Sequence, residues 1–263
     1  MSDAALPLRT RALIAVARTG TGLLKLAGQR ERVLRWRIER ARRARRAVGP
    51  DSPLGWPALH GMDRRLDALI DRDGGFFVEA GANDGYTQSN TYGLERFRGW
   101  TGILVEPMQE LFEIAREERE GAKVVRAALV PFDHEGDTVR MRFADLMSTV
   151  SDGHADDWRT RMGTITGWRD PYEADVPART LSSILDEQGA PEVDVLSLDV
   201  EGYEPSVLRG LDLDRHAPRW ILVEVHDLET GRPPIEAVLG DRYAFHSTLS
   251  PLDVLYRRVD VPG

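Results

Sequence analysis

From Met62 onward, short apolar runs alternate with segments of helical periodicity. Strands are predicted at FFVEA (76–80), GILVE (102–106), KVVRAALV (123–130), VDVLSLD (193–199) and WILVEV (220–225), and helices at 62–70, 86–97, 108–120, 181–188 and 205–209. RYAFH (242–246) and DVLYRR (253–258) are candidates for late strands, antiparallel ones included. Strands that are apolar almost throughout are buried on both faces, as in a parallel sheet covered by helices. The sequence therefore predicts an α/β fold with a mostly parallel twisted sheet and helices on both faces.

One long stretch does not follow this alternation. DTVRMRF (137–143) has a period of two, which places Val139, Met141 and Phe143 on one face of a strand. The residues that follow are rich in Asp, Gly and Thr. Long insertions in compact domains are often functional. Residues 131–180 are therefore interpreted as an insertion that helps to bind a substrate, with simple packing as the alternative.

The N-terminal segment differs in charge from the rest of the chain. Residues 1–50 carry thirteen Lys and Arg against three Asp and Glu, although the whole chain has a net charge of -8. RERVLRWRIERARRARRAV (30–48) has helical periodicity, and glycines and prolines follow it. We interpret residues 1–50 as a basic helical extension and 51–263 as the functional domain. The extension is either solvated or an arm that binds an anionic membrane surface or a protein.

Composition excludes several classes of protein. The acidic body argues against nucleic-acid binding, which needs clustered cations. Without cysteine the chain has no disulfide framework and no thiolate chemistry. The apolar segment at 12–28 is interrupted by Arg18 and Lys25 and is shorter than the ~20 residues that span a bilayer. We expect a cytoplasmic protein, with peripheral contact at the inner membrane surface as the alternative that the arm allows.

Polar residues follow the predicted strands at the point where each strand ends. Ligands of open parallel sheets bind beyond the carboxyl ends of the strands. We therefore expect these side chains to share one site: Glu79, Gly81, Asn83 and Gly85 after the first strand, Glu106 after the second, Asp199 and Glu201 after the fourth, and Glu224 and His226 at the fifth.

The loop after the first strand indicates the type of ligand. Glu106 follows Gly85 by 21 residues, at the end of the next strand, where an acid accepts hydrogen bonds from a ribose. The dinucleotide fingerprint fails because Asn83 and Tyr86 occupy the positions of its second and third glycines, and the loop has no phosphate-binding lysine. A nucleoside with a cationic or zwitterionic tail fits better. S-adenosylmethionine has both features.

Two segments make the chain similar to a known family. FFVEAGANDGYTQSNTYGLERFRGWTGILVEP (76–107) and ARTLSSILDEQGAPEVDVLSLDVEGYEPSVLRGLD (178–212) resemble the FkbM family of S-adenosylmethionine-dependent methyltransferases. The resemblance implies a Rossmann-like methyltransferase fold and, usually, O-methylation of a hydroxyl on a sugar, glycolipid or polyketide-type product. Many relatives are aliphatic where this chain has Asp84, so the methyl acceptor cannot be carried across.

The resemblance also implies a set of cofactor-binding residues. Ser89 and Asn90, expected on the first turn of the following helix, would donate to the cofactor carboxylate. The remaining residues would contact the methionine portion (Glu79, Gly81, Asn83, Gly85), the ribose (Glu106) and the adenine (Ala127, Ala128), and Asp199 would lie between cofactor and acceptor.

A hydroxyl acceptor must lose its proton to a base or through a divalent cation. Asp199, Glu201 and His226 are the candidate catalytic residues, and Glu204 is expected to start a helix instead. Alternatively Asp199, Glu201, Glu224 and His226 would bind Mg²⁺. The chain is therefore expected to be an O-methyltransferase for a small-molecule or glycan acceptor. A catalytically silent nucleoside-binding or scaffold protein, docked through the basic arm, is the alternative.

Overall fold

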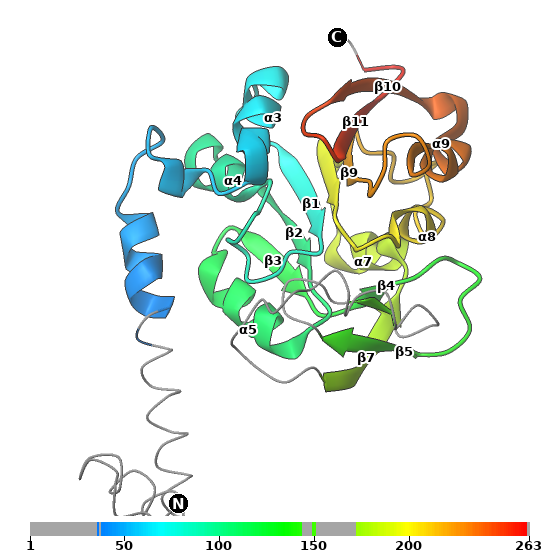
Figure 1. Cartoon of the computed structure of the whole chain (residues 1–263), viewed down its shortest axis with the longest axis horizontal. Coiled ribbons are helices and arrows are strands. Elements are labelled where there is room, and N and C mark those ends of the chain that lie inside the picture. The colour runs from blue at the N-terminus through cyan, green and yellow to red at the C-terminus, as the bar shows by residue number, and fades with distance from the viewer. Residues whose placement is uncertain (1–35, 37, 144–148, 151–171, 262–263) are drawn as a thin grey trace, which may run out of the picture. The chain divides into compact units, whose positions relative to one another are not determined.

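The computed structural model describes residues 36, 38–143, 149–150 and 172–261 (Figure 1). The chain divides into two units, residues 1–48 and 49–263. In the first unit residues 38–46 are helical, which confirms that part of the predicted helix. Glu39 pairs there with Arg42 at 3.1 Å and with Arg43 at 3.0 Å. Residues 30–35 of the predicted helix lie outside the described residues.

The second unit is built on a seven-stranded sheet in the order β10-β11-β9-β8-β1-β2-β3. All neighbours pair in parallel except β11, which is antiparallel to both β9 and β10. The mostly parallel sheet and the antiparallel late strand confirm the predicted fold class. The strands are β1 (Phe76–Ala80), β2 (Thr101–Val105), β3 (Ala122–Val125), β8 (Val195–Leu198), β9 (Trp220–Glu224), β10 (Tyr243–Thr248) and β11 (Asp253–Arg258).

Helices cover both faces of this sheet. Successive residues of each strand point to opposite faces, so each face packs against its own set of helices. Val78, Leu196 and Ile221 belong to one buried cluster with side chains of α7 (Leu181–Gln188), α8 (Glu204–Leu208) and α9 (Arg232–Leu239). Phe77, Val195 and Leu222 belong to another with side chains of α3 (Met62–Ile70) and α4 (Tyr92–Arg98). Other helical segments among the described residues are α5 (Gln109–Glu118) and the 3₁₀ turns η2 (Pro53–Gly55), η3 (Leu59–Gly61) and η4 (Gly240–Arg242).

A second, smaller sheet has the order β4-β7-β5-β6, in which β5, β6 and β7 come from residues 131–180 and β4 precedes them. Its strands are β4 (Ala128–Leu129), β5 (Thr138–Phe143), β6 (Thr149–Val150) and β7 (Tyr172–Arg179). Val139 and Met141 of β5 are buried with Met108 and Val176, whereas Arg140 faces outward and pairs with Glu173 at 3.1 Å. The predicted alternation of β5 is thus confirmed for Val139 and Met141. The rest of the predicted insertion, at 144–148 and 151–171, lies outside the described residues.

Two predicted elements differ from the structure by more than two residues at one end. KVVRAALV does not form one strand, because β3 ends at Val125 and β4 leaves the main sheet to pair with β7. The helix predicted at 86–97 begins only at Tyr92. Gln88 takes a left-handed conformation with φ of 63°, and Asp84 accepts hydrogen bonds from Tyr86 N (2.9 Å) and Thr87 N (2.6 Å). These features keep the chain in a loop up to Thr91.

The strand order places a switch point beside β1. The chain runs from β1 through α4 to β2 on one side, whereas β8 lies on the other side of β1 and is reached only after the insertion and α7. In sheets of this kind the crevice at the switch point, beyond the carboxyl ends of the strands, is where ligands bind. No helix among the described residues is both long and apolar enough to cross a bilayer.

Candidate functional site

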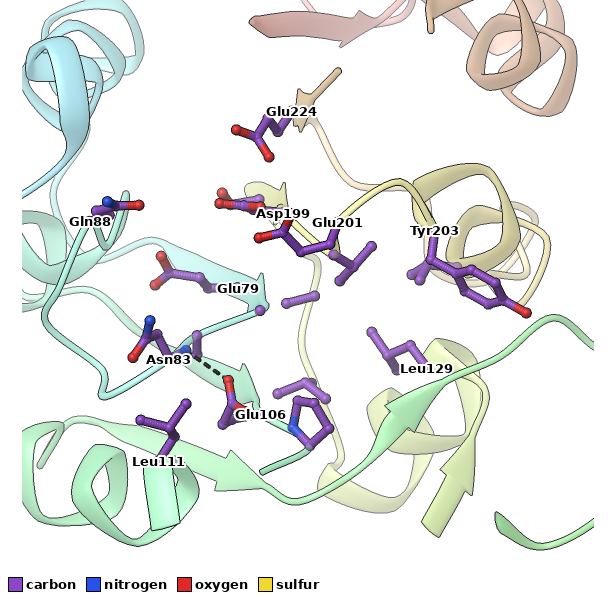
Figure 2. Close-up of a pocket in the computed structure, with 18 of the residues that line it drawn as sticks. Glu79, Asn83, Gln88, Glu106, Leu111, Leu129, Asp199, Glu201, Tyr203 and Glu224 are labelled. Carbon is purple, nitrogen blue, oxygen red and sulfur yellow. Dashed lines mark hydrogen bonds between the residues drawn. The ribbon is translucent and has the colours of Figure 1, made fainter. Parts of the chain in front are cut away.

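A cavity of about 370 Å³ lies at the carboxyl ends of β1, β2, β8 and β9 (Figure 2). It brings together residues that are more than a hundred positions apart in the chain. The predicted site residues that line it are Glu79, Gly81, Asn83, Ser89, Asn90, Glu106, Ala127, Ala128, Asp199, Glu201, Glu224 and His226.

Gly85 is the predicted site residue that does not line the cavity. A Cβ atom added there would lie 3.0 Å from Arg119 Cγ and 3.1 Å from Ala115 Cα. Gly85 is therefore needed where the loop packs on α5, and its expected contact with the ligand stays a prediction. Gly81 lines the cavity, but its φ is 80° and an added Cβ would lie 1.8 Å from the carbonyl oxygen of Asp199. The absent side chain lets the ends of β1 and β8 approach each other.

Glu79 is buried and is bound mainly by its own loop. Its Oε2 accepts from the Ser89 hydroxyl at 2.8 Å and from the Thr91 hydroxyl, and its Oε1 accepts from Asn90 N at 2.8 Å. The Arg119 guanidinium is 3.4 Å from Oε2. Glu79 thus holds the wall of the cavity in shape, a role that the sequence interpretation did not include.

Ser89 and Asn90 precede α4 and do not lie on its first turn, which corrects the prediction. The helix begins after Thr91 because the backbone N–H groups of Thr87 and Asn90 donate to the side chains of Asp84 and Glu79 and are held in the loop. Asn90 is 7% exposed, and its Nδ2 donates to Ser197 Oγ at 3.1 Å. Its Oδ1 has no hydrogen-bond partner within the part of the chain that the structure describes. A buried acceptor of this kind is normally satisfied, so it suits a donor group of a ligand.

Glu106 is 4% exposed, and backbone amides hold it in place. Asn83 N donates to its Oε2 and Met108 N to its Oε1, each at 2.8 Å; Figure 2 shows the bond from Asn83. Burial raises the pKa of Glu106 to about 8, although the two amide bonds oppose the shift. Each oxygen keeps a lone pair for a further donor. Two hydroxyls of a ribose would fill both positions.

Asp199, Glu201 and Glu224 form an acidic wall on the opposite side of the cavity (Figure 2). Burial raises the pKa of Asp199 well above its usual range, and the adjacent Glu224 carboxylate raises it further. Burial, then Glu224 and Glu204, raise the pKa of Glu201 to about 7. Because like charges in a low-dielectric site resist joint ionisation, this wall favours a positively charged ligand.

A tight turn after β8 presents Glu201 to the cavity. Glu201 has a φ of 56° and Gly202 a φ of 91°, both in the left-handed region. Glu204 accepts from Val200 N at 3.0 Å and Gly202 N at 3.1 Å, so it fastens the turn and begins α8 as predicted. A Cβ added to Gly202 would lie 3.2 Å from His226 Nε2, so His226 packs against this same turn.

The sequence interpretation missed several residues of the site. Gln88, Leu111, Leu129, Met141 and Tyr203 also line the cavity. Their residue types carry no chemical signal, and only the fold brings them to one place. Within the ranges 38–143 and 172–261, no three His, Asp or Glu side chains are arranged to hold a metal ion. The Mg²⁺ site therefore remains a prediction.

Comparisons with known proteins agree with this geometry. A family model described as the methyltransferase FkbM domain matches residues 79–247. Methyltransferase 1 of Beauveria bassiana (strain ARSEF 2860) is 28% identical over 173 residues, which cover 62% of this chain and 67% of that protein. Methyltransferase sdnD of Sordaria araneosa is 37% identical over 79 residues, which cover 27% of this chain but only 30% of that protein.

Among solved structures, the Aeropyrum pernix fibrillarin with natively bound S-adenosyl-L-methionine is similar at 10% identity, over 74% of each chain, with a TM-score of 0.40. The family match defines the class of this protein, which is that of the S-adenosylmethionine-dependent methyltransferases with a Rossmann-like fold. The chain belongs to the FkbM methyltransferase family.

Proposed function

We propose that this protein transfers a methyl group from S-adenosylmethionine to a hydroxyl of a sugar, a glycolipid or glycan, or a polyketide-type natural product. The observation that carries the proposal is the composition of the cavity wall. Glu79, Glu106, Asp199, Glu201 and Glu224 line it, and no Lys or Arg stands among its described lining residues. Such a wall suits a cationic nucleoside and disfavours a pyrophosphate.

The residues present fit the proposed donor. Glu106 offers two fixed acceptors for the ribose diol. The unpartnered Oδ1 of Asn90 offers an acceptor for an ammonium group. Ala127, Ala128 and Leu129 line the cavity and would give an apolar side for the adenine. When bound, S-adenosylmethionine supplies an activated methyl group on a sulfonium, so the protein mainly has to align the acceptor oxygen and remove its proton.

Asp199 and Glu201 are the bases that we assign to proton removal. Both line the cavity, and both have a raised pKa, which makes the ionised carboxylate a stronger base. Asp199 becomes easier to ionise when a cation is bound beside it. His226 lines the same cavity and is the alternative base. The presence of these candidate bases in the cavity favours a hydroxyl acceptor. A hydroxyl must lose its proton to attack, whereas a neutral amine can attack before it loses its proton.

Calorimetry with S-adenosylhomocysteine tests the proposed donor. We expect binding of S-adenosylhomocysteine and no binding of NADH, because the acidic wall repels a pyrophosphate. The reverse result, or binding of neither compound, would contradict the proposal.

A catalytically silent protein would bind S-adenosylhomocysteine but transfer no label from methyl-labelled S-adenosylmethionine into an extract of a deletion strain. If methyl transfer persists in the presence of EDTA, proton removal from the acceptor does not depend on Mg²⁺.

The rate of methyl transfer is expected to depend on the ionisation of Glu201. Since its pKa is about 7, the fraction of ionised base rises with pH up to that value and then levels. If Glu201 is the base, initial rates should fall about tenfold for each pH unit well below 7. Rates measured from pH 5 to 9 check this. A Glu201→Gln variant that keeps both the rate and the acidic limb would assign the base to Asp199 or His226.

A further inference from the structure

Arg119 follows α5 and is 2% exposed, yet it does not line the cavity. Ionised side chains this deeply buried are stable only when their charge and hydrogen bonds are matched. The matching partners of Arg119 belong to the loop that follows β1.

The guanidinium of Arg119 contacts the loop at several positions. Nη1 donates to Gly85 O at 3.2 Å and to Ser89 Oγ at 3.1 Å, and Nη2 donates to Thr91 Oγ1 at 2.8 Å. Nε donates to Glu95 Oε2 on α4 at 2.7 Å, and Nη1 is 3.4 Å from Glu79 Oε2 on β1. One side chain therefore ties the loop to the strand before it and to the helix after it.

The surroundings fit a planar guanidinium and not simply a positive charge. Its Cζ lies 5.1 Å from the ring centroid of Phe77 and 5.8 Å from that of Tyr92. Gly85 leaves room for its stem, because a Cβ there would be 3.0 Å from Arg119 Cγ. A lysine would carry the charge but could not reach this many acceptors in a fixed plane.

The hydrogen bonds from Arg119 to Gly85 and Thr91 lie at the two ends of the part of the loop that faces the ligand. Thr87, Gln88, Ser89 and Asn90 line the cavity, and they lie between Gly85 and Thr91. Gln88, with φ of 63°, is held in a conformation that side-chain-bearing residues rarely adopt. Such conformations persist only where the surrounding structure imposes them.

We propose that Arg119 is a positioning residue for the methyl donor, which fixes residues 85–91 as the wall of the donor site without touching the ligand. This inference rests on the proposed function, since it takes the cavity to be the donor site. It adds a residue that the motifs of the sequence did not indicate. It also gives Glu79 a partner in shaping the loop.

Two variants test the proposal from outside the cavity. Arg119→Lys keeps the charge but loses the planar guanidinium. Thr91→Val keeps the shape of the side chain but removes the hydroxyl that accepts from Arg119 and donates to Glu79. Arg116→Lys, an exposed change on α5, is the control. Arg119→Lys is expected to weaken the binding of S-adenosylhomocysteine about tenfold or more, and Thr91→Val about threefold, whereas Arg116→Lys should bind like the wild type. Thermal melts show that each variant is folded at the temperature of the calorimetry.

Hydrogen exchange separates positioning from a general loss of stability. In Arg119→Lys, peptides that cover 81–91 should exchange faster, while those that cover β8 should exchange at the wild-type rate. Two folded variants that bind S-adenosylhomocysteine within about twofold of the wild type would overturn the proposal. Faster exchange throughout the chain would overturn it too. If Arg119→Lys does not fold, Thr91→Val decides. A wild type that binds no S-adenosylhomocysteine would instead refute the proposed function.

Discussion

Replacing Asp199 with asparagine is expected to lower the rate of methyl transfer by about 10²- to 10⁴-fold, the range that a positioned general base contributes. Asparagine has nearly the same shape as aspartate but cannot accept a proton at neutral pH. The fold should survive the change. Asp199 is half-buried beside Glu224, and partial burial and that neighbour both resist its ionisation. The variant should therefore melt at the same temperature as the wild type or at a higher one.

The measurement is the transfer of labelled methyl from S-adenosylmethionine into an extract of a deletion strain, which supplies the acceptor. Asp241→Asn, an exposed change in η4, serves as the control and should keep the wild-type rate. Binding of S-adenosylhomocysteine should change little in Asp199→Asn. If affinity falls as far as the rate does, Asp199 holds the donor. If the rate stays within about tenfold of the wild type, another group removes the proton.

Much of the fold could be predicted because strong local patterns determine it. FFVEA forms β1 with the predicted bounds, and LSSILDEQ forms α7, where Thr180 caps the helix and Gly189 ends it. Buried parallel strands need apolar residues on both faces, and the sequence shows this directly. The position of the cavity could be predicted for the same reason. Once the strands are in parallel, Glu106 and Asp199 must meet at one edge of the sheet.

The errors arose where contacts distant in sequence override local preference. The segment at 86–97 has helical periodicity, but the bonds from Ser89 and Asn90 to Glu79 hold its first part as a loop. Arg119 gave no signal among the 35 Lys and Arg residues, because its partners lie 24 to 40 positions away. Periodic patterns of apolar residues can be recognised in a sequence, whereas the partners in a buried polar network are known only from the assembled fold.

Glu106→Gln is expected to weaken the binding of S-adenosylhomocysteine by about 1.5–3 kcal/mol, or roughly 10- to 150-fold, the usual range for hydrogen bonds to a charged group. Glutamine offers one oxygen where Glu106 offers two, and its amide nitrogen would face the N–H of Asn83 or Met108. The neutral side chain therefore loses an acceptor for the ribose and leaves a backbone donor unmatched. Calorimetry measures the loss. Glu113→Gln, on the exposed side of α5, is the matched control and should bind like the wild type.

The dependence of this affinity on pH gives a second, independent readout. The pKa of Glu106 is about 8 in the free protein because the group is buried, and hydroxyl donors favour its ionised form. Binding should therefore release a proton below pH 8, so that affinity rises with pH and levels above that value. The gain should approach about tenfold per pH unit if only the ionised form binds. Glu106→Gln should lose the part of this dependence that belongs to position 106, because glutamine does not titrate, whereas Glu201 with its pKa of about 7 is still present. A wild type whose affinity is constant from pH 6 to 9 would show that Glu106 does not hold the ribose.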